Sequence, residues 1–252
     1  MLDVVDLREF YASPLGQMTR RMLSHRIRSR FRPGQGARVL GIGYAIPYLE
    51  PWRAEAERVF AFMPARQGVV HWPQTGLNDA ALVEEADLPL PDASIDLALL
   101  VHGLELTDQL PDLLRELWRV LAPQGRALFV VPNRRGMWAR FDSTPFGHGR
   151  PFSRGQFTDL LRDAAFTPTG WAYALFAPPI GRSFLIRSAP AFERVGLWIS
   201  PGFAGLIVVE AVKQVYAISR GKRAKRLMPV IKPRLIPVPS LRRGRQQQSS
   251  MP

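Results

Sequence analysis

Two side chains that can hold or move a proton, His102 and Glu105, follow directly after an apolar run that ends at Val101. Residues at the end of a buried strand lie on the side where ligands bind in open parallel sheets. Free histidine titrates near neutrality, so His102 can act as a general base or orient a substrate. A histidine that only caps the end of the strand explains the same residue, and both interpretations stay open.

A second candidate site is the turn in the phrase RVLGIGYAIP, residues 38–47, which contains Gly41 and Gly43. Glycine lets the backbone approach a ligand with no side chain between them, and a following helix N-terminus presents free N–H groups. Ala45 adds a methyl group to the turn, while Pro47 suits the first turn of a helix. The pattern predicts a ligand-binding turn with little room.

The elements that must position these residues are clearest in residues 88–133. Ile95–Val101 is an almost unbroken apolar run, which is typical of a strand buried on both faces. Leucines and valines then recur every three or four residues and indicate an amphipathic helix, which Pro123 and Gly125 end. Residues 126–131 return as a second buried strand. The segment is therefore a strand, helix, strand unit of an α/β sheet, with a right-handed crossover.

Weaker signals place the other elements. Ser153 is expected to cap a helix, with Gln156 completing a capping box. An N-terminal helical segment is expected before Pro33 and Gly34. Further strands are expected at residues 38–43, 58–63, 169–176 and 204–209, and helices at residues 5–31, 154–165 and 190–197.

LPLPDASIDLALLVHGLE, followed by LLRELWRVLAPQGRALFVVPN, resembles the region between the third and fifth strands of class I S-adenosylmethionine-dependent methyltransferases, type 11-like. The likeness extends less strictly over residues 38–213. It implies a Rossmann-like, mostly parallel seven-stranded sheet with helices on both faces. It also implies S-adenosyl-L-methionine as the cofactor and methyl transfer to an acceptor that the sequence does not identify.

The resemblance implies cofactor contacts at three places. The first turn would contribute Gly41, Gly43 and Ala45. The segment after the third strand would contribute Glu84 or Glu85 near the adenine amino group. Leu88 would line the adenine base, and His102 would also contact the cofactor.

The cofactor motif departs from the family pattern at two anchors. Gly41 stands where an acid is usual, and residues 62–65 offer no acid to bind the ribose hydroxyls. Loss of a charged acceptor for hydroxyl groups costs roughly 1.5 to 3 kcal/mol, or one to two decades of affinity, unless another group replaces it. A modest affinity for the cofactor is therefore expected.

The acceptor is expected near the N-terminal helices and the loop after the fifth strand. Tyr11 would lie near the methionine end of the cofactor, although packing explains it equally well. The phrase HGRPFS matches a family phrase through His148 and Arg150. Arg134 and Trp138 are candidates for recognising an anionic or aromatic acceptor, although surface exposure alone explains an arginine.

Length and composition favour one large domain with appendages. The chain has 252 residues, of which 46% are hydrophobic, and no cysteine, which excludes disulfides, thiolate metal sites and a cysteine nucleophile. No metal site is predicted. Residues 1–30 lack the features of a secretory signal, and the longest apolar stretch, residues 195–209, is too short to span a membrane. A cytoplasmic location is the simplest expectation.

The net charge of +13 is concentrated at the C-terminus. Residues 211–252 contain 11 of the 34 lysines and arginines and no acidic residue. We therefore expect an N-terminal helical cap at residues 1–34, an α/β domain at 35–216, and a basic, proline-rich, disordered tail at 217–252. The tail has the composition to contact nucleic acid or an anionic membrane, and it equally suits a solubilising terminus.

Two other classes of function remain open. The eroded turn favours a catalytically degenerate relative that acts as a binding module, and the basic tail favours an RNA-associated or membrane-associated protein. A third observation concerns the phrase WISPGFAGLIVV, which is apolar enough to contact lipid. Lack of a base would not exclude methyl transfer, because the reaction depends mainly on in-line positioning of an acceptor that is already nucleophilic.

Overall fold

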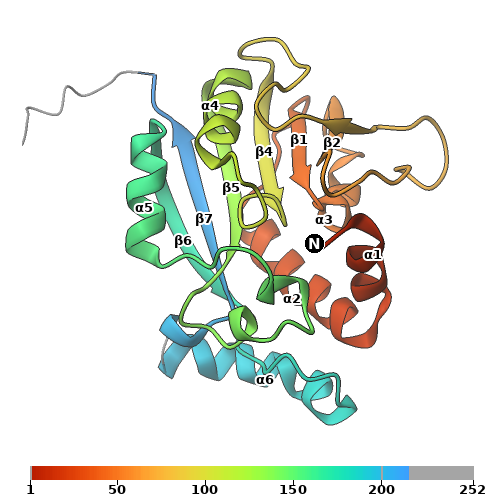
Figure 1. Cartoon of the computed structure of the whole chain (residues 1–252), viewed down its shortest axis with the longest axis vertical. Coiled ribbons are helices and arrows are strands. Elements are labelled where there is room, and N and C mark those ends of the chain that lie inside the picture. The colour runs from red at the N-terminus through yellow and green to blue at the C-terminus, as the bar shows by residue number, and fades with distance from the viewer. Residues whose placement is uncertain (1, 200, 216–252) are drawn as a thin grey trace, which may run out of the picture. The chain divides into compact units, whose positions relative to one another are not determined.

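The computed structural model describes residues 2–199 and 201–215, so the expected tail lies outside the described residues. Seven strands form one sheet in the order β3-β2-β1-β4-β5-β7-β6 (Figure 1). The strands are β1 (Arg38–Gly43), β2 (Arg58–Pro64), β3 (Ala80–Val83), β4 (Ile95–Val101), β5 (Leu121–Pro132), β6 (Phe166–Ala174) and β7 (Leu206–Lys213).

The sheet is mixed, which corrects the expectation of a mostly parallel one. All four pairings among β1 to β5 are parallel, whereas β7 runs antiparallel to both β5 and β6. After β6 the chain leaves the sheet and returns at the same end, with Leu206 opposite Ala174. Both strands are apolar, and an apolar run does not encode the direction in which its strand enters the sheet.

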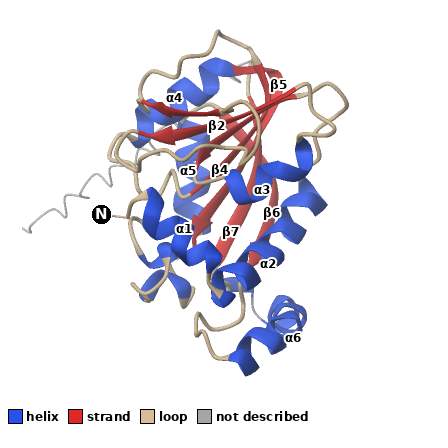
Figure 2. Cartoon of the chain, turned by 90° about the vertical axis from the view of Figure 1, so that its right-hand side faces the viewer, coloured by secondary structure: helices blue, strands red, loops and turns tan. Residues whose placement is uncertain are grey.

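Helices cover both faces of the sheet, as expected (Figure 2). One face carries α1 (Val4–Ala12), α2 (Pro14–Arg30), α3 (Ile46–Leu49) and α6 (Ser183–Ile199). The other face carries α4 (Leu110–Val120) and α5 (Arg154–Asp163). Two separate apolar cores result, because alternate residues of each buried strand point to opposite faces.

Several boundaries follow the sequence signals closely. The Ser153 side chain accepts a hydrogen bond from the Gln156 N–H and the Gln156 side chain accepts one back, which confirms the capping box. Strand β4 has the expected bounds. Helix α6 begins at Ser183, before the predicted start at residue 190. Pro190 lies inside the helix, and because proline has no N–H to donate within a helix, the sequence gives little sign that the helix begins earlier.

The two motifs that carry the family resemblance are joined by a polar clamp. Glu116 on α4 accepts a hydrogen bond from the Leu88 N–H at 3.0 Å. Arg119, one turn later, donates to Glu116, to the carbonyl oxygens of Leu88 and Leu90, and to Asp92. The helix therefore holds the LPLPD loop in place before β4, so these motifs stabilise the fold rather than bind a ligand.

Replacement of Glu116 by glutamine is expected to reduce the free energy of unfolding at pH 7 by about 1 to 3 kcal/mol, because Arg119 loses a charged acceptor. The hydrogen bond from Arg119 lowers the pKa of Glu116. Because the folded-state pKa is lowered, this stabilisation is complete above the unfolded-state pKa of about 4.3 and is lost progressively as the pH falls from there through the folded-state pKa. Urea unfolding should show the difference at pH 7 and a shrinking one below pH 4.

The matched control is Glu55→Gln, because Glu55 is an exposed glutamate for which no described residue is a side-chain partner. It should leave the unfolding midpoint unchanged. Equal stability of the Glu116 variant and the parent at pH 7 would show that the clamp does not contribute.

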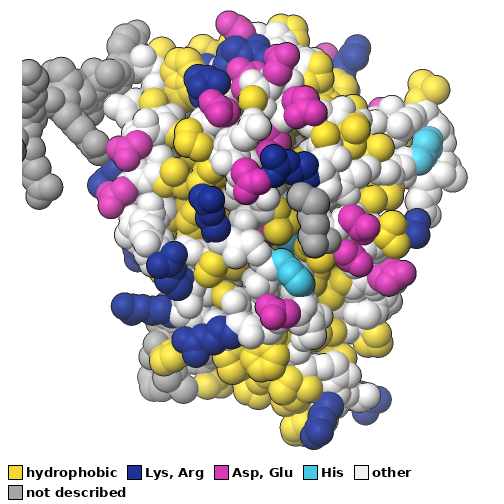
Figure 3. All heavy atoms as spheres, in the orientation of Figure 1, with side chains coloured by type: hydrophobic (Ala, Val, Ile, Leu, Met, Phe, Trp, Pro, Cys, Tyr) yellow, Lys and Arg dark blue, Asp and Glu magenta, His cyan; other side chains and the backbone are white. Residues whose placement is uncertain are grey.

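The end of the domain near α6 exposes apolar side chains, and Figure 3 shows hydrophobic residues gathered at this lower end of the face. Phe184 is 77% exposed and Phe203 is 70% exposed. By contrast, Ala204 and the described part of β7 up to Val209 are buried, so the C-terminal half of WISPGFAGLIVV does not offer a surface to lipid. Within the described residues, no helix is long and apolar enough to cross a bilayer.

Candidate active site

The carboxyl ends of β1, β2 and β4 meet at the point where the strand order reverses, which is the usual place for a ligand in an open α/β sheet. Gly43 at the end of β1 has φ +78°, and His102 directly after β4 has φ +54°. The Tyr44 N–H donates to the Val101 carbonyl oxygen at 2.8 Å. A left-handed conformation costs a residue other than glycine about 1 to 3 kcal/mol, so the surrounding structure must hold His102 in place.

His102 is fully buried, with the Tyr11 hydroxyl beside one ring nitrogen and the Glu105 carboxylate beside the other. The Tyr48 hydroxyl donates to the Tyr11 oxygen at 2.9 Å, and the Tyr11 oxygen is 3.0 Å from His102 Nε2. Because the Tyr11 oxygen already accepts from Tyr48, its own proton is available to Nε2, and this leaves the ring proton on Nδ1. Nδ1 is 3.2 Å from a Glu105 carboxylate oxygen, without the alignment of a hydrogen bond.

Aromatic side chains fill the space around this network. The Tyr11 ring stacks on Tyr44 with centroids 5.6 Å apart, and the Phe146 ring lies 4.4 Å from that of His102. Burial, followed by the neighbouring Tyr48, raises the pKa of Tyr11 well above the usual value, and burial also raises the pKa of Tyr48. Both hydroxyl groups therefore stay protonated at neutral pH and can donate hydrogen bonds.

A cavity of about 170 Å³ lies beside the network, at the ends of β2, β3 and β4. Gln67 forms part of its wall and donates through Nε2 to the His102 carbonyl oxygen at 3.0 Å. Gln67 Oε1 is buried without a hydrogen-bond partner in the described part of the chain. Glu85 also lines the cavity; burial raises its pKa, although a hydrogen bond from Thr107 opposes this effect. Gln67 and Glu85, which both carry acceptor oxygens, therefore line the same small cavity.

The two glycines of the first turn lie close to other parts of the protein, so a side chain at either position would meet protein atoms. Their contacts with the cofactor remain a prediction. A Cβ atom on Gly43 would lie 2.3 Å from the Val101 carbonyl oxygen. A Cβ atom on Gly41 would lie 2.5 Å from Leu49 Cδ1 and 2.9 Å from the Cβ atom of Ala45. Gly43 allows β1 and β4 to approach closely, and Gly41 and Ala45 accommodate the buried Leu49 side chain.

Gly41→Asp restores the acid that is usual in the family, yet it is expected to destabilise this chain by about 3 kcal/mol or more. The new side chain overlaps Leu49 and places a carboxylate in an apolar core. Urea unfolding of the full chain checks this result.

The double variant Gly41→Asp, Leu49→Ala is the informative partner, because it removes the overlapping side chain. Its loss of stability should be smaller than the sum of the two single losses, since the two sites touch. Strictly additive losses, or a stable Gly41→Asp variant, would show that Leu49 does not occupy this position.

Of the residues expected after the third strand, only Glu85 reaches the cavity. Glu84 is exposed and pairs with Asp87 through a single backbone bridge. Leu88 is buried in the core beneath α4, on the opposite face of the sheet from Tyr11. The expected contact between Leu88 and an adenine base is therefore corrected, since this side chain packs against the helix.

The expected acceptor residues fall into different environments. Tyr11 belongs to the His102 network, and His148 lines the cavity with its Nε2 atom 2.9 Å from the Asp142 carbonyl oxygen. Trp138 is fully buried, and its N–H donates to the Ala177 carbonyl oxygen at 2.8 Å. The expectation that Trp138 meets the acceptor is corrected, because its indole is a core group.

The two arginines expected to contact the acceptor, Arg134 and Arg150, are exposed. Arg134 points back to the Pro151 carbonyl oxygen at 3.4 Å. The backbone N–H of Arg150 donates to the Glu105 carbonyl oxygen at 2.8 Å. Arg150 therefore ties this loop to the end of β4 through its backbone, while its side chain faces solvent.

Sequence reasoning missed Gln67 and Tyr48. Gln67 lies three residues after the end of β2, in the segment where an acid was sought, and an amide was not considered as its replacement. Tyr48 lies on α3 in the phrase IPYL, one turn after the glycine turn. The position of Tyr48 shortly after the glycine turn is the sequence feature that could have identified it.

Comparisons with known proteins agree with this architecture. Residues 40–129 match a family described as a methyltransferase domain. A probable S-adenosylmethionine-dependent methyltransferase from Mycolicibacterium smegmatis is 39% identical over 84 residues, which are 32% of this chain and 32% of that protein. The match thus spans about a third of the curated relative.

Solved structures extend the likeness over most of the domain. An S-adenosylmethionine-dependent methyltransferase from Thermotoga maritima has a TM-score of 0.58 and 16% identity, covering 84% of this chain and 95% of that one. Another from Mesorhizobium loti has a TM-score of 0.52 and 16% identity, covering 75% and 96%. At these identities the likeness concerns the fold. Together with the matched domain, it confirms the resemblance to class I methyltransferases, type 11-like.

Proposed function

We propose that this chain, whose residues 40–129 form a methyltransferase domain, transfers a methyl group from S-adenosylmethionine to an acceptor. The observation that carries the proposal is Gln67, which lines a cavity where the strand order reverses and whose buried Oε1 atom has no hydrogen-bond partner among the described residues. A buried acceptor left without a hydrogen bond costs about 1 to 3 kcal/mol, and a ligand hydroxyl group would remove that cost.

The residues around the cavity suit the nucleoside half of the cofactor. Gln67 supplies an acceptor after β2, where the family acid is absent, and Glu85 supplies one after β3. The cavity of about 170 Å³ is smaller than the roughly 300 to 1,000 Å³ of most ligand sites. Helix α1 closes it, because the Val4 N–H donates to the Gln67 carbonyl oxygen at 2.7 Å. Binding of the whole cofactor therefore requires α1 to move.

When bound, the cofactor supplies an electrophilic methyl group on a sulfonium. The chain's own residues would position the acceptor and exclude water, which is the main requirement of methyl transfer. Release of Tyr11 by movement of α1 would free His102 Nε2 to accept a proton, while Glu105 steadies the opposite side of the ring. His102 is thus a candidate base that Tyr11 blocks in the closed form.

A second candidate is a binding module without chemistry. The packing of Leu49 under Gly41 and the aromatic filling around Tyr11 favour it, because both occupy space beside the turn. Both features leave less room for a cofactor, so absence of cofactor binding would support a cofactor-free binding module, and binding without methyl transfer would support one that keeps the cofactor.

The test uses methyl-labelled S-adenosylmethionine, the full chain and a fractionated cell extract as the source of acceptors. We expect label to appear in one fraction, and His102→Gln to slow the transfer without abolishing cofactor binding. Binding of the cofactor with no label in any fraction would contradict methyl transfer and support the binding module.

A further inference from the structure

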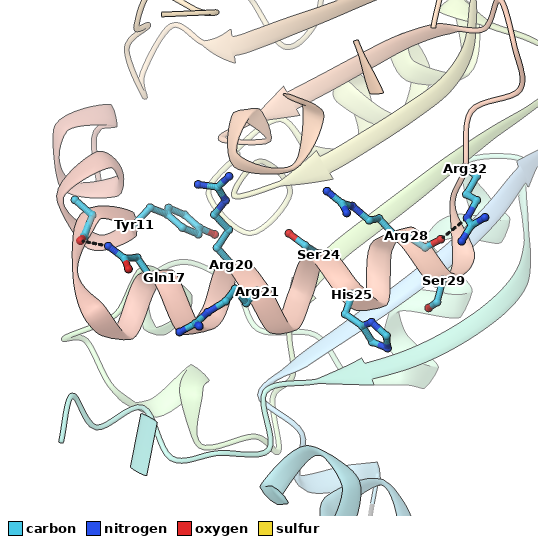
Figure 4. Close-up of a pocket in the computed structure, with 10 residues that line it drawn as sticks. Tyr11, Gln17, Arg20, Arg21, Ser24, His25, Arg28, Ser29 and Arg32 are labelled. Atoms are coloured by element: carbon cyan, nitrogen blue, oxygen red, sulfur yellow. Dashed lines mark hydrogen bonds between the residues drawn. The ribbon is translucent and has the colours of Figure 1, made fainter. Parts of the chain in front are cut away.

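An open groove of about 940 Å³ lies beside α2 (Figure 4). Its walls come mainly from one helix and contain no acidic residue. Four arginines and a histidine supply its charge, namely Arg20, Arg21, His25, Arg28 and Arg32. The groove is therefore a concentrated positive surface in a domain whose basic residues are otherwise interspersed with acids.

The arginines of α2 divide into two groups. Arg26 pairs with Glu193 at 3.6 Å and Arg30 donates to the Trp171 carbonyl oxygen at 3.0 Å, so these two fasten the helix to the domain. Arg21 and Arg28 line the groove, are exposed, and make no ion pair or side-chain hydrogen bond with any residue the structure describes. Their guanidinium groups are available to a ligand.

We propose that this groove binds the phosphodiester backbone of a single-stranded RNA. Arginine presents a planar fork of donors that matches phosphate oxygens. With a rise of 1.5 Å per residue, Arg20 and Arg28 lie about 12 Å apart along α2, and Arg32 follows the end of the helix, so the row is long enough for successive phosphates. A single phosphate group would need only one end of such a row.

A membrane surface fits this helix less well. The apolar residues of α2, Met18, Leu23 and Ile27, are buried in the core and cannot enter lipid. Interfacial helices bind membranes by placing their apolar face between the lipids. The charged stripe of α2 therefore offers electrostatic contact alone, which suits a dissolved polyanion.

One end of the groove reaches the candidate active site. Tyr11 lines both the groove and the His102 network. Arg20 lies close enough to Tyr48 to lower the pKa of that tyrosine against the larger effect of burial. An RNA chain in the groove would thus pass the wall of the site. Binding of RNA does not depend on methyl transfer, so the two proposals can fail separately.

The test compares the full chain with the double variant Arg21→Gln, Arg28→Gln in fluorescence-anisotropy titrations of a labelled 12-nucleotide oligouridylate, between about 50 and 200 mM KCl. Each lost phosphate contact reduces the slope of log affinity against log salt by about 0.7 for a single strand. We expect the slope to fall by about 1.4 and the affinity to drop on the order of ten-fold at 0.1 M salt.

The matched control, Arg115→Gln, Arg162→Gln, removes the same charge from α4 and α5 on the opposite face and leaves the basic tail intact. It should leave the slope unchanged. Equal losses in both variants, or no loss in either, would overturn the proposal, because binding would then depend on net charge or on another part of the chain. Loss of binding to phosphatidylglycerol vesicles, with RNA binding unchanged, would also overturn it and assign the groove to a lipid surface.

Discussion

Gly43→Ala is expected to lower the free energy of unfolding by roughly 3 to 5 kcal/mol, enough to unfold a domain of ordinary stability. Two costs combine. The residue has φ +78°, which strains any side chain, and the added Cβ atom would lie 2.3 Å from the Val101 carbonyl oxygen, a backbone atom that cannot turn aside. The strands β1 and β4 would have to separate at the site itself. Urea unfolding followed by circular dichroism measures the loss.

Gly155→Ala is the control for this result. Gly155 lies in the first turn of α5, and a Cβ atom there would meet nothing within 4 Å. Alanine is the better helix former by about 1 kcal/mol, so the variant should be as stable as the parent or slightly more stable. A Gly43→Ala variant that unfolds at the parent midpoint would show that β1 and β4 do not meet in this way.

Gln67→Leu is expected to weaken binding of S-adenosylhomocysteine about ten-fold or more. The change keeps the size of the side chain and removes the buried Oε1 acceptor of a residue that lines the cavity, together with the Nε2 donor to the His102 carbonyl oxygen. Loss of one good hydrogen bond to a ligand hydroxyl corresponds to about 1.5 kcal/mol, which is a factor of about ten in affinity. Calorimetric titration of parent and variant gives the ratio.

Glu84→Gln is the comparison for the Gln67 variant, because Glu84 is exposed and lies outside the cavity. It should bind the ligand as the parent does. If Glu84→Gln weakens binding and Gln67→Leu does not, the nucleoside lies on the outer side of β3, and the assignment of the cavity is wrong. Thermal unfolding without ligand separates a loss of affinity from a loss of fold.

Much of the fold could be predicted because its signals are local. The apolar run of β4, the spacing of α4 and the capping box of Ser153 depend on neighbouring residues, and each appears as expected. The direction of β7 could not be predicted, since it depends on the route of the chain through α6. The seven-stranded sheet followed from the family resemblance.

The site was less readable because its residues come from distant segments. Position after β4 identified His102, but the contact of Tyr11 with His102 joins residues 91 apart in the chain. The close packing at Gly41 and Gly43 could not be predicted, because the neighbours that fill their space, Leu49 and β4, are known only from the fold. Trp138 had the residue type of a binding group, and only its burial shows that it is a core residue.

Calorimetric titration of the full chain with S-adenosylhomocysteine tests the central claim most directly, because it requires neither an acceptor nor turnover. The account predicts a saturable one-to-one heat with modest affinity, since the acid after β2 is absent and α1 must move to admit the ligand. Absence of any heat up to millimolar ligand, with the chain folded by circular dichroism, would contradict cofactor binding in the cavity at the ends of β2, β3 and β4.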